Sequence, residues 1–492
     1  MTNGPLGGIL SFGAYIPKKR LQRASIYAAN AWFAGGLKGL AKGERAIGDW
    51  DEDAITMAVE AARDTLEGVD RTTVGSVALA STTLPFVDRQ NSGVIKEALN
   101  LADETGAMDV TGSMRAATSL LIQALKGAGG GSGDGRVQLV LASEMRKARP
   151  ASEGELVNGD AAAGVLVGSG DAVALFKGSY STTIDFVDHY RSTGMDFDYG
   201  WESRWIRDEG FTGLIGGALK DGLKALGVEA GTIDKFIVPI SVRGVPDGLA
   251  KKAGIKPEAV ADVLSASVGD SGAAHPLLLL VAALEAAKPG EKILLVGFGQ
   301  GVDLILLETT EALAKLSPRK GVKGSLARGQ KDENYLRWLF HRGLLDLERG
   351  MRAEADQKQP GTTLWRNRKA VLGLVGGRCT KTGTVQFPRS DISVNPNDHA
   401  AHTQEDYPLA DKRAKIVTYT ADALTYSPAP PSYYGMIDFD GGGRMMIEFA
   451  DVSADDVEVG REMEMVFRIK GTDEMRDFTK YFWKAAPVAK EA

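Results

Sequence analysis

The sequence predicts an α/β domain over the first three hundred residues, followed by a small helical segment and an antiparallel β barrel. Three observations support this order. Short runs that are apolar at nearly every position alternate with helical patterns, as in repeated βα units. After residue 310 a basic stretch punctuated by Gly and Pro precedes an amphipathic pattern. From residue 370 onward, apolar and polar residues alternate over short segments, which is typical of antiparallel strands.

The strands of the α/β region are apolar at nearly every position, so we expect them to be buried on both sides. They are predicted at residues 8–12, 74–80, 137–142, 163–167, 235–238 and 293–297. Helical patterns lie between them, at residues 53–66, 117–126, 216–226 and 276–287.

Two stretches of this region share one pattern. Residues 58–66 form a helical segment that leads through a polar turn to an apolar strand at 74–79. Residues 217–226 lead in the same way to a strand at 233–238. This repetition indicates an internally duplicated domain, and the alternative is that any two helix–strand units look alike.

The elements of the later part of the chain are predicted from its proline residues and from the spacing of its apolar and polar residues. Leu336, Leu339, Phe340, Leu344, Leu347 and Met351 mark one apolar stripe of a helix. Strands are expected at residues 415–421, 433–440, 444–449 and 462–469, with Pro428, Pro430 and Pro431 stiffening one connection. Residues 486–492 are expected to form a frayed tail.

Bulk composition excludes several classes of protein. A chain of 492 residues is too long for one core, so two or three domains are expected. The formal charge of −6 argues against a generally basic nucleic-acid binder. A single cysteine gives no disulfide framework, which fits the reducing cytoplasm. No apolar run has membrane-spanning length and the first residues lack the pattern of a signal peptide, so we expect a soluble cytoplasmic protein.

Five motifs occur in order along the first 310 residues. They are Gly13-Ala-Tyr-Ile-Pro17, Asp51-Glu-Asp53 followed by Ala58-Val-Glu-Ala-Ala62, Gly159-Asp-Ala-Ala-Ala163, Gly269-Asp-Ser-Gly-Ala-Ala-His-Pro276 and Gly297-Phe-Gly-Gln-Gly301. Together they resemble hydroxymethylglutaryl-CoA synthases of the archaeal and bacterial type, within the thiolase superfamily. The resemblance implies a duplicated βαβαβ core in α/β/α/β/α layers, a coenzyme A thioester as ligand and a homodimer formed through the duplicated domain.

A second resemblance covers the C-terminal third. Gly377-Arg-Cys-Thr-Lys-Thr-Gly-Thr-Val-Gln-Phe-Pro-Arg389 is similar to the rubredoxin-like zinc ribbon of OB-fold proteins that accompany thiolases. That similarity implies a thiolase as partner protein. The predicted domains are therefore a synthase-like domain at 1–312, a linker at 313–331, a helical segment at 332–369, a degenerate ribbon at 370–404 and an OB-fold domain at 405–486.

The ribbon lacks most of its metal ligands. A structural zinc needs four, normally in two Cys-x-x-Cys pairs. Here Cys379 is followed by Thr382, and no cysteine stands near Ser393 and Pro396, where the second pair is expected. His399 and His402 have ligand-like spacing, although in a polar loop they also fit a solvated surface. We expect the ribbon to fold without zinc.

The catalytic groups that the resemblance implies are absent from their positions. Aligning the threonine of the synthase cysteine loop with Thr118 places Met114 at the nucleophile position, and a thioether cannot form an acyl-enzyme. Ser113 is the neighbouring hydroxyl, which could act as a nucleophile or simply cap a helix. The general-acid position falls near Thr82, and the histidine position falls around Val238 or Pro239.

Other polar residues remain near the predicted pocket. Asp270 stands where the family has asparagine, and with His275 it could transfer protons, unless His275 only caps the following helix. Tyr190, with Asp198 and Tyr199, lies in a segment of the pocket wall. These side chains could polarise a carbonyl or could be ordinary surface residues.

Arg243 and Lys251 follow the strand from which the histidine is missing, where the family contacts coenzyme A. A phosphate contact there competes with the commoner solvated role of Lys and Arg. Three functions fit these observations. The first is an acyl-CoA-binding subunit of a thiolase complex without its own cysteine chemistry. The second is a cysteine-independent lyase acting on a β-hydroxyacyl-CoA, and the third is an acyltransferase with an unusual nucleophile.

Overall fold

The computed structural model describes residues 7–129, 136–348 and 361–488. It divides into two compact units. Unit 1 consists of Met1–Asp49, Asp53–Gly93 and Ala102–Trp338. Unit 2 consists of Trp50–Glu52, Val94–Leu101 and Leu339–Ala492.

Unit 1 is built on a nine-stranded sheet of two related halves. The first half runs outward from the middle in the order β1 (Gly8–Tyr15), β7 (Ala161–Gly168), β6 (Val137–Glu144), β4 (Val74–Ala80), β5 (Gly106–Val110). The second half runs in the order β8 (Ala174–Thr183), β13 (Gly301–Thr309), β12 (Lys292–Phe298), β11 (Lys235–Ile237).

The pairing directions of the two halves correspond strand by strand. In each half the first three strands pair antiparallel and the next pair is parallel. Beyond β11, a parallel bridge between Phe236 and Val260 stands where β5 stands in the first half. Only two residue pairs, Gly8↔Leu175 and Ile9↔Ala174, join the halves. The predicted duplication is therefore confirmed.

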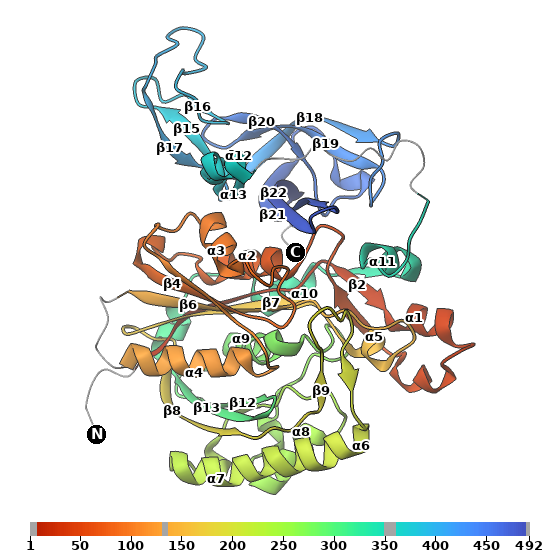
Figure 1. Cartoon of the computed structure of the whole chain (residues 1–492). Helices are drawn as coiled ribbons and strands as arrows, with labels where there is room; N and C mark the ends of the chain where they lie inside the picture. The colour runs from red at the N-terminus through yellow and green to blue at the C-terminus, as the bar shows by residue number, and fades with distance from the viewer. Residues whose placement is uncertain (1–6, 130–135, 349–360, 489–492) are drawn as a thin grey trace. The chain divides into compact units, whose positions relative to one another are not determined.

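The helices complete five layers (Figure 1). On the outer faces, α2 (Ala54–Thr65) packs on β1, β6 and β7, and α7 (Gly216–Leu226) packs on β8 and β13. Between the half-sheets lie α4 (Ala116–Gly129) and α9 (His275–Ala286), which contact strands of both halves. Because it is enclosed on all sides, α9 is apolar around its circumference, and Leu277, Leu278, Leu279 and Leu280 are all buried.

Residues 313–331 do not form the predicted linker. They contain α10 (Gly321–Ala327), which packs on β1 and α9, and most of β14 (Gln330–Asp332). The β14 strand pairs in parallel with β2 (Lys19–Gln22). The Glu285 carboxylate accepts hydrogen bonds from the Val322 and Lys323 amides at 2.7 and 3.1 Å. The basic composition suggested a solvated tether, but the backbone of this stretch is satisfied by unit 1.

The predicted amphipathic stripe is also wrong. The helix α11 covers only Tyr335–His341, and its buried face carries Tyr335, Trp338 and Leu339, whereas Leu336 is exposed. Leu347 is exposed as well, and Met351 lies outside the described residues. Two short helices, α12 (Gly361–Arg366) and α13 (Arg368–Gly373), follow. The prediction followed the spacing of the leucines, which fits a longer helix. It did not consider Tyr335 and Trp338, the two aromatic residues that are buried.

Unit 2 contains a three-stranded ribbon and a five-stranded barrel sheet. The ribbon consists of β15 (Val375–Cys379), β16 (Val385–Gln386) and β17 (Gln404–Pro408). The barrel strands are β18 (Ala414–Asp422), β19 (Ser432–Phe439), β20 (Arg444–Glu448), β21 (Glu462–Asp473) and β22 (Phe478–Pro487), in the order β20-β19-β18-β21-β22. A bridge between Phe449 and Ala485 closes the barrel.

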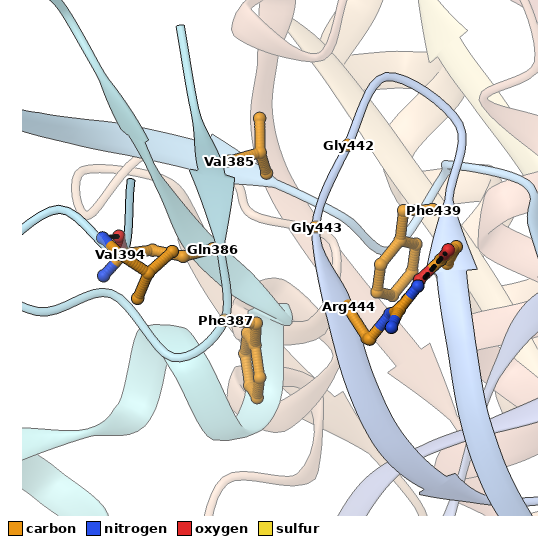
Figure 2. Close-up of a pocket in the computed structure, with 9 residues that line it drawn as sticks. Val385, Gln386, Phe387, Val394, Phe439, Gly442, Gly443 and Arg444 are labelled. Atoms are coloured by element: carbon orange, nitrogen blue, oxygen red, sulfur yellow. Dashed lines mark hydrogen bonds and ion pairs between the residues drawn. The ribbon is translucent and has the colours of Figure 1, made fainter. Parts of the chain in front are cut away.

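Sequence reasoning missed β22, and the predicted frayed tail is corrected accordingly. Ala486 is buried and pairs with Glu464, while residues 489–492 lie outside the described residues. The ribbon packs near the turn between β19 and β20, where a cavity of about 380 Å³ remains (Figure 2). Gly443 has a φ of +97°, and a Cβ there would lie 3.1 Å from Val385 Cγ1, so the turn needs glycine for both reasons.

Candidate active site

The loop before α4 holds Ser113 in a structural role. The Ser113 hydroxyl donates a hydrogen bond to the Gly299 carbonyl at 3.0 Å and accepts one from the Arg115 amide at 3.3 Å. Gly299 has a φ of +154°, and a Cβ on it would lie 2.8 Å from Ser113 Oγ. A backbone carbonyl accepts this hydrogen bond but is too weak a base to remove the proton. Ser113 therefore has no activating base in this arrangement.

A buried aspartate on β13 holds the same loop in place. Asp303 on β13 accepts hydrogen bonds from the Thr118 and Ser119 hydroxyls, at 2.9 and 2.7 Å. Its other oxygen lies 3.1 Å from Arg115 Nη1. Arg115 also donates to the Thr182 carbonyl at 2.8 Å. The start of α4 is thus anchored to β8 and to β13. These contacts leave the loop little freedom to present another nucleophile.

Met114 lies against charged groups from two other segments. A Cβ atom built on Gly272 would stand 3.3 Å from Met114 Sδ, 2.9 Å from Glu144 Cγ and 3.1 Å from Arg146 Nε. These three side chains therefore meet around one point. The Met114 side chain is a thioether, which cannot be deprotonated.

Glu144 is the site residue that sequence reasoning missed. It ends β6, is fully buried, and accepts hydrogen bonds from the Thr82 amide at 3.1 Å, from the Ala273 amide at 3.3 Å and from the Thr83 hydroxyl. Burial raises the pKa of its carboxyl, against the effect of these hydrogen bonds. The segment around Thr82 has no acid of its own, but a carboxylate from β6 lies directly against it.

Arg146 neutralises the carboxylates around it. Its guanidinium lies 3.4 Å from Asp270 Oδ1 and 3.9 Å from Asp198 Oδ2, and it donates to Asn158 Oδ1 at 3.1 Å. Arg191 pairs with the other oxygen of Asp198 at 3.0 Å and also donates to the Thr82 carbonyl. Two arginines and two aspartates thus form one mostly buried network beside Met114.

Asp270 and His275 flank the short turn before α9, and the charge of each influences the pKa of the other. Burial, the largest single effect, disfavours the charge of Asp270, but the charge of Arg146, the nearby histidines and the Gly272 amide together lower the pKa of this carboxyl below its usual value. Burial lowers the pKa of His275, so the ring is neutral. Its Nδ1 lies 3.1 Å from the Ser271 hydroxyl, and the residue occupies the first turn of α9. Asp270 is therefore an ionised partner of Arg146, and His275 is a buried neutral base.

The remaining predicted residues lie on the surface. Tyr190 and Tyr199 pair across a short hairpin of β9 (His189–Tyr190) and β10 (Tyr199–Gly200), and both are about half exposed. Asp198 in the same hairpin is the only one of the three that joins the Arg146 network. Arg243 and Lys251, before and within α8 (Val245–Ala253), are exposed.

The ribbon residues do not fit a zinc site. Cys379 is buried with its Sγ 3.1 Å from the Thr403 hydroxyl, whereas His399 and His402 are exposed. In the described ranges no group of three or more His, Cys, Asp or Glu side chains is arranged to hold a metal ion. One thiol beside a hydroxyl does not supply the four ligands that zinc requires.

Curated relatives match most of the chain. A hydroxymethylglutaryl-CoA synthase of Methanosarcina mazei is 29% identical over 353 residues, which cover 69% of this chain and 99% of the relative. One of Aeropyrum pernix is 31% identical over 325 residues, which cover 63% of this chain and 87% of the relative. The chain belongs to the hydroxymethylglutaryl-CoA synthase family.

Family models and solved structures agree with this assignment. Residues 223–305 match the C-terminal model of 3-oxoacyl-[acyl-carrier-protein] synthase III, and residues 407–468 match the C-terminal OB-fold domain of ChsH2. A crystal structure of hydroxymethylglutaryl-CoA synthase complexed with CoA has a TM-score of 0.56 at 18% identity, covering 72% of this chain and 94% of that one. Both predicted resemblances, to the thiolase superfamily and to the OB-fold proteins, are confirmed.

This synthase-family chain also carries a signal that would have revealed Glu144 and Arg146. Both come within four residues of the end of the mostly apolar stretch at 137–142, and polar residues at the carboxyl end of a buried strand are typical of α/β sites. Of the helices that the structure describes, none combines the length and apolarity needed to cross a membrane.

The buried Glu144 carboxyl predicts a specific pH dependence of stability. Because its pKa is raised on folding, the folded protein keeps this proton to higher pH than the unfolded chain. The resulting stabilisation is complete below the unfolded pKa of about 4.3 and is lost as the pH rises toward the folded pKa. Glu144→Gln cannot titrate, so its free energy of unfolding should improve relative to wild type above about pH 4.3. Urea unfolding of both proteins across this range measures the difference, and a pH-independent difference contradicts the assignment.

Proposed function

We propose that the synthase-like domain binds an acyl-CoA thioester without forming an acyl-enzyme, and that the chain works as a subunit of a complex with a cysteine-bearing thiolase. The observation that carries this proposal is Met114 at the nucleophile position, held beside Glu144 and Arg146. Ser113 offers no substitute, because its proton is donated to a carbonyl. A condensing enzyme of this superfamily needs an acylated nucleophile.

Binding of coenzyme A is supported by the relatives. One structure of similar fold is described as complexed with CoA, and another, of OleA from Xanthomonas campestris, carries bound lauroyl-CoA. Arg243 and Lys251 are exposed and charged, so they are available to pair with the phosphates of the ligand. The reaction served by such a complex is formation or cleavage of a carbon–carbon bond in an acyl-CoA.

The proposed complex is supported by the C-terminal domain. The barrel is similar to the OB-fold domain of ChsH2, and the preceding ribbon resembles proteins that accompany thiolases. The synthase-like domain is also proposed to pair with a second copy. β5 is an edge strand of the large sheet, and its Met108 is about half exposed, so the edge is available for such pairing.

Two measurements test the proposal. Intact-mass spectrometry of the full chain after incubation with acetyl-CoA or acetoacetyl-CoA should show no covalent acyl group. Purification from its native host should recover a thiolase, and condensation of acyl-CoA should appear only with that thiolase and should depend on the thiolase's cysteine. An acyl group on Ser113 would sink the proposal and leave the acyltransferase reading in its place.

A cysteine-independent lyase is the second candidate. The observation in its favour is that an ionised carboxylate, Asp270, and a neutral buried imidazole, His275, lie on one loop beside Glu144, whose pKa is raised by burial. Such a set can move protons during aldol cleavage of a β-hydroxyacyl-CoA. Cleavage of such a thioester by the isolated chain, lost in His275→Gln, decides for the lyase over the non-catalytic subunit.

A further inference from the structure

The hairpin beside the candidate active site has an unusual concentration of exposed apolar side chains. Between residues 184 and 205, six large apolar residues are between 37% and 57% exposed: Ile184, Tyr190, Met195, Tyr199, Trp201 and Trp205. Scattered exposed residues of this kind are normal, but a cluster of them marks a surface that another molecule covers. Tyr and Trp are also the residues that contribute most to binding at protein interfaces.

The aromatic rings of this cluster contact one another. The centroids of Tyr199 and Trp201 are 5.3 Å apart with the rings at 73°, and Tyr190 lies 5.6 Å from Tyr199 and 6.4 Å from Trp201. Trp205 stacks on Phe186 at 4.3 Å. These ring contacts hold the cluster in place although its outer faces are open to solvent.

A surface cavity of about 460 Å³ lies between these rings. Tyr199, Gly200, Trp201, Glu202 and Trp205 line it, so its walls are three aromatic rings and one carboxylate. The Glu202 side chain accepts hydrogen bonds from the Arg204 and Trp205 amides at 3.0 and 2.7 Å, which fixes its position. Those hydrogen bonds lower its pKa, so the carboxylate is charged at neutral pH.

The charge of this surface selects the class of ligand. Residues 196–209 contain five acidic residues and two arginines, and without Asp198, which pairs with Arg146 and Arg191, the segment is still net negative. A nucleotide with several phosphates is disfavoured there. Aromatic faces around an ionised carboxylate favour a cation, because the ring quadrupole and the carboxylate both attract positive charge. We propose that the cavity of Tyr199, Trp201, Trp205 and Glu202 is a docking site for an arginine or lysine side chain of a partner protein.

The position of the cavity gives this contact a consequence for the site. The same hairpin carries Arg191 and Asp198, whose side chains join the buried network around Arg146. A partner bound in the cavity therefore contacts the exposed side of the β9–β10 hairpin, while the buried side of the same hairpin contacts the candidate active site. Tyr199 of β10 and Trp205 of α6 (Ser203–Trp205) line the same cavity. The inference extends the proposed complex, but its test does not require the partner to be a thiolase.

The test uses the full chain and two peptides. One peptide alternates arginine and glycine, and its twin has neutral citrulline in place of arginine. Tryptophan fluorescence and calorimetry should show that the arginine peptide binds, and that the citrulline peptide binds at least about tenfold more weakly. Glu202→Gln and Trp201→Leu should each weaken the arginine peptide by a similar factor. Trp365→Leu, at another exposed tryptophan, should leave its affinity unchanged.

Several outcomes overturn the inference. They are an arginine peptide that fails to bind, a citrulline twin that binds equally well, and variants at Glu202 and Trp201 that keep wild-type affinity. Adenosine 3′,5′-bisphosphate is titrated in parallel, and binding that Trp201→Leu abolishes would make the cavity a nucleotide site instead. Thermal unfolding of each variant shows that the fold is intact. If the peptide binds but no thiolase co-purifies, the proposed complex fails while the docking site stands.

Discussion

Replacing Arg468 with alanine should lower the stability of unit 2 by about 3–5 kcal/mol, the cost of breaking a buried ion pair. Arg468 on β21 is almost fully buried, with Nη2 3.0 Å from Asp451 and 3.3 Å from Glu52, and with Nε 3.9 Å from Asp51. Removing the guanidinium leaves these carboxylates buried next to one another. Of the positive side chains in these contacts, Lys484 then remains, with its Nζ 2.9 Å from Asp51.

Hydrogen exchange of the β21 and β22 amides measures this loss directly, because their protection reports local unfolding. Arg444→Ala is the matched control. Arg444 pairs with Asp438 at 2.6 Å in the same sheet, but both side chains are exposed, so the change should cost far less stability than the loss of Arg468 (Figure 2). If the two variants lose equal protection, the buried cluster does not stabilise the barrel.

Restoring a thiol at position 114 should convert a chain that is not acylated into one that is. In a Cys379→Ala background, Met114→Cys supplies the only thiol of the protein. Arg146 lies around the same point as Met114, and a nearby positive charge lowers the pKa of a thiol and favours the reactive thiolate. Incubation with acetyl-CoA should then give up to one acetyl group per chain, detected by intact-mass spectrometry.

Two comparisons make this experiment decisive. Cys379→Ala alone should remain unmodified, and so should Met114→Ser in the same background, because a serine there has no thiolate to form. If Met114→Cys stays unmodified while it remains folded and binds coenzyme A, the site around Glu144 and Arg146 no longer positions a thioester for attack. The proposed acyl-CoA-binding role would then need another site.

Local sequence patterns predicted much of the fold. The strands at 74–80 and 137–142 and the helix at 216–226 were visible because a buried strand is apolar at nearly every position and a helix repeats every 3.6 residues. The duplication was visible in the repeated helix–turn–strand pattern. The 313–331 segment was mispredicted as a linker from its basic side chains. Its order comes from the hydrogen bonds that its backbone makes to Glu285 and to β2, and side-chain charge does not reveal those bonds.

The sequence by itself determined that the loop before α4 contains Met114 and no cysteine, because that statement concerns which atoms are present. Only the tertiary structure decided which charges surround it. Glu144 and Arg146 follow one strand, whereas Asp198 and Asp270 come from two other segments of the chain, and the contacts among these groups span 3–4 Å. Electrostatic interactions at that range follow from how loops of different strands converge, and no local pattern encodes that convergence.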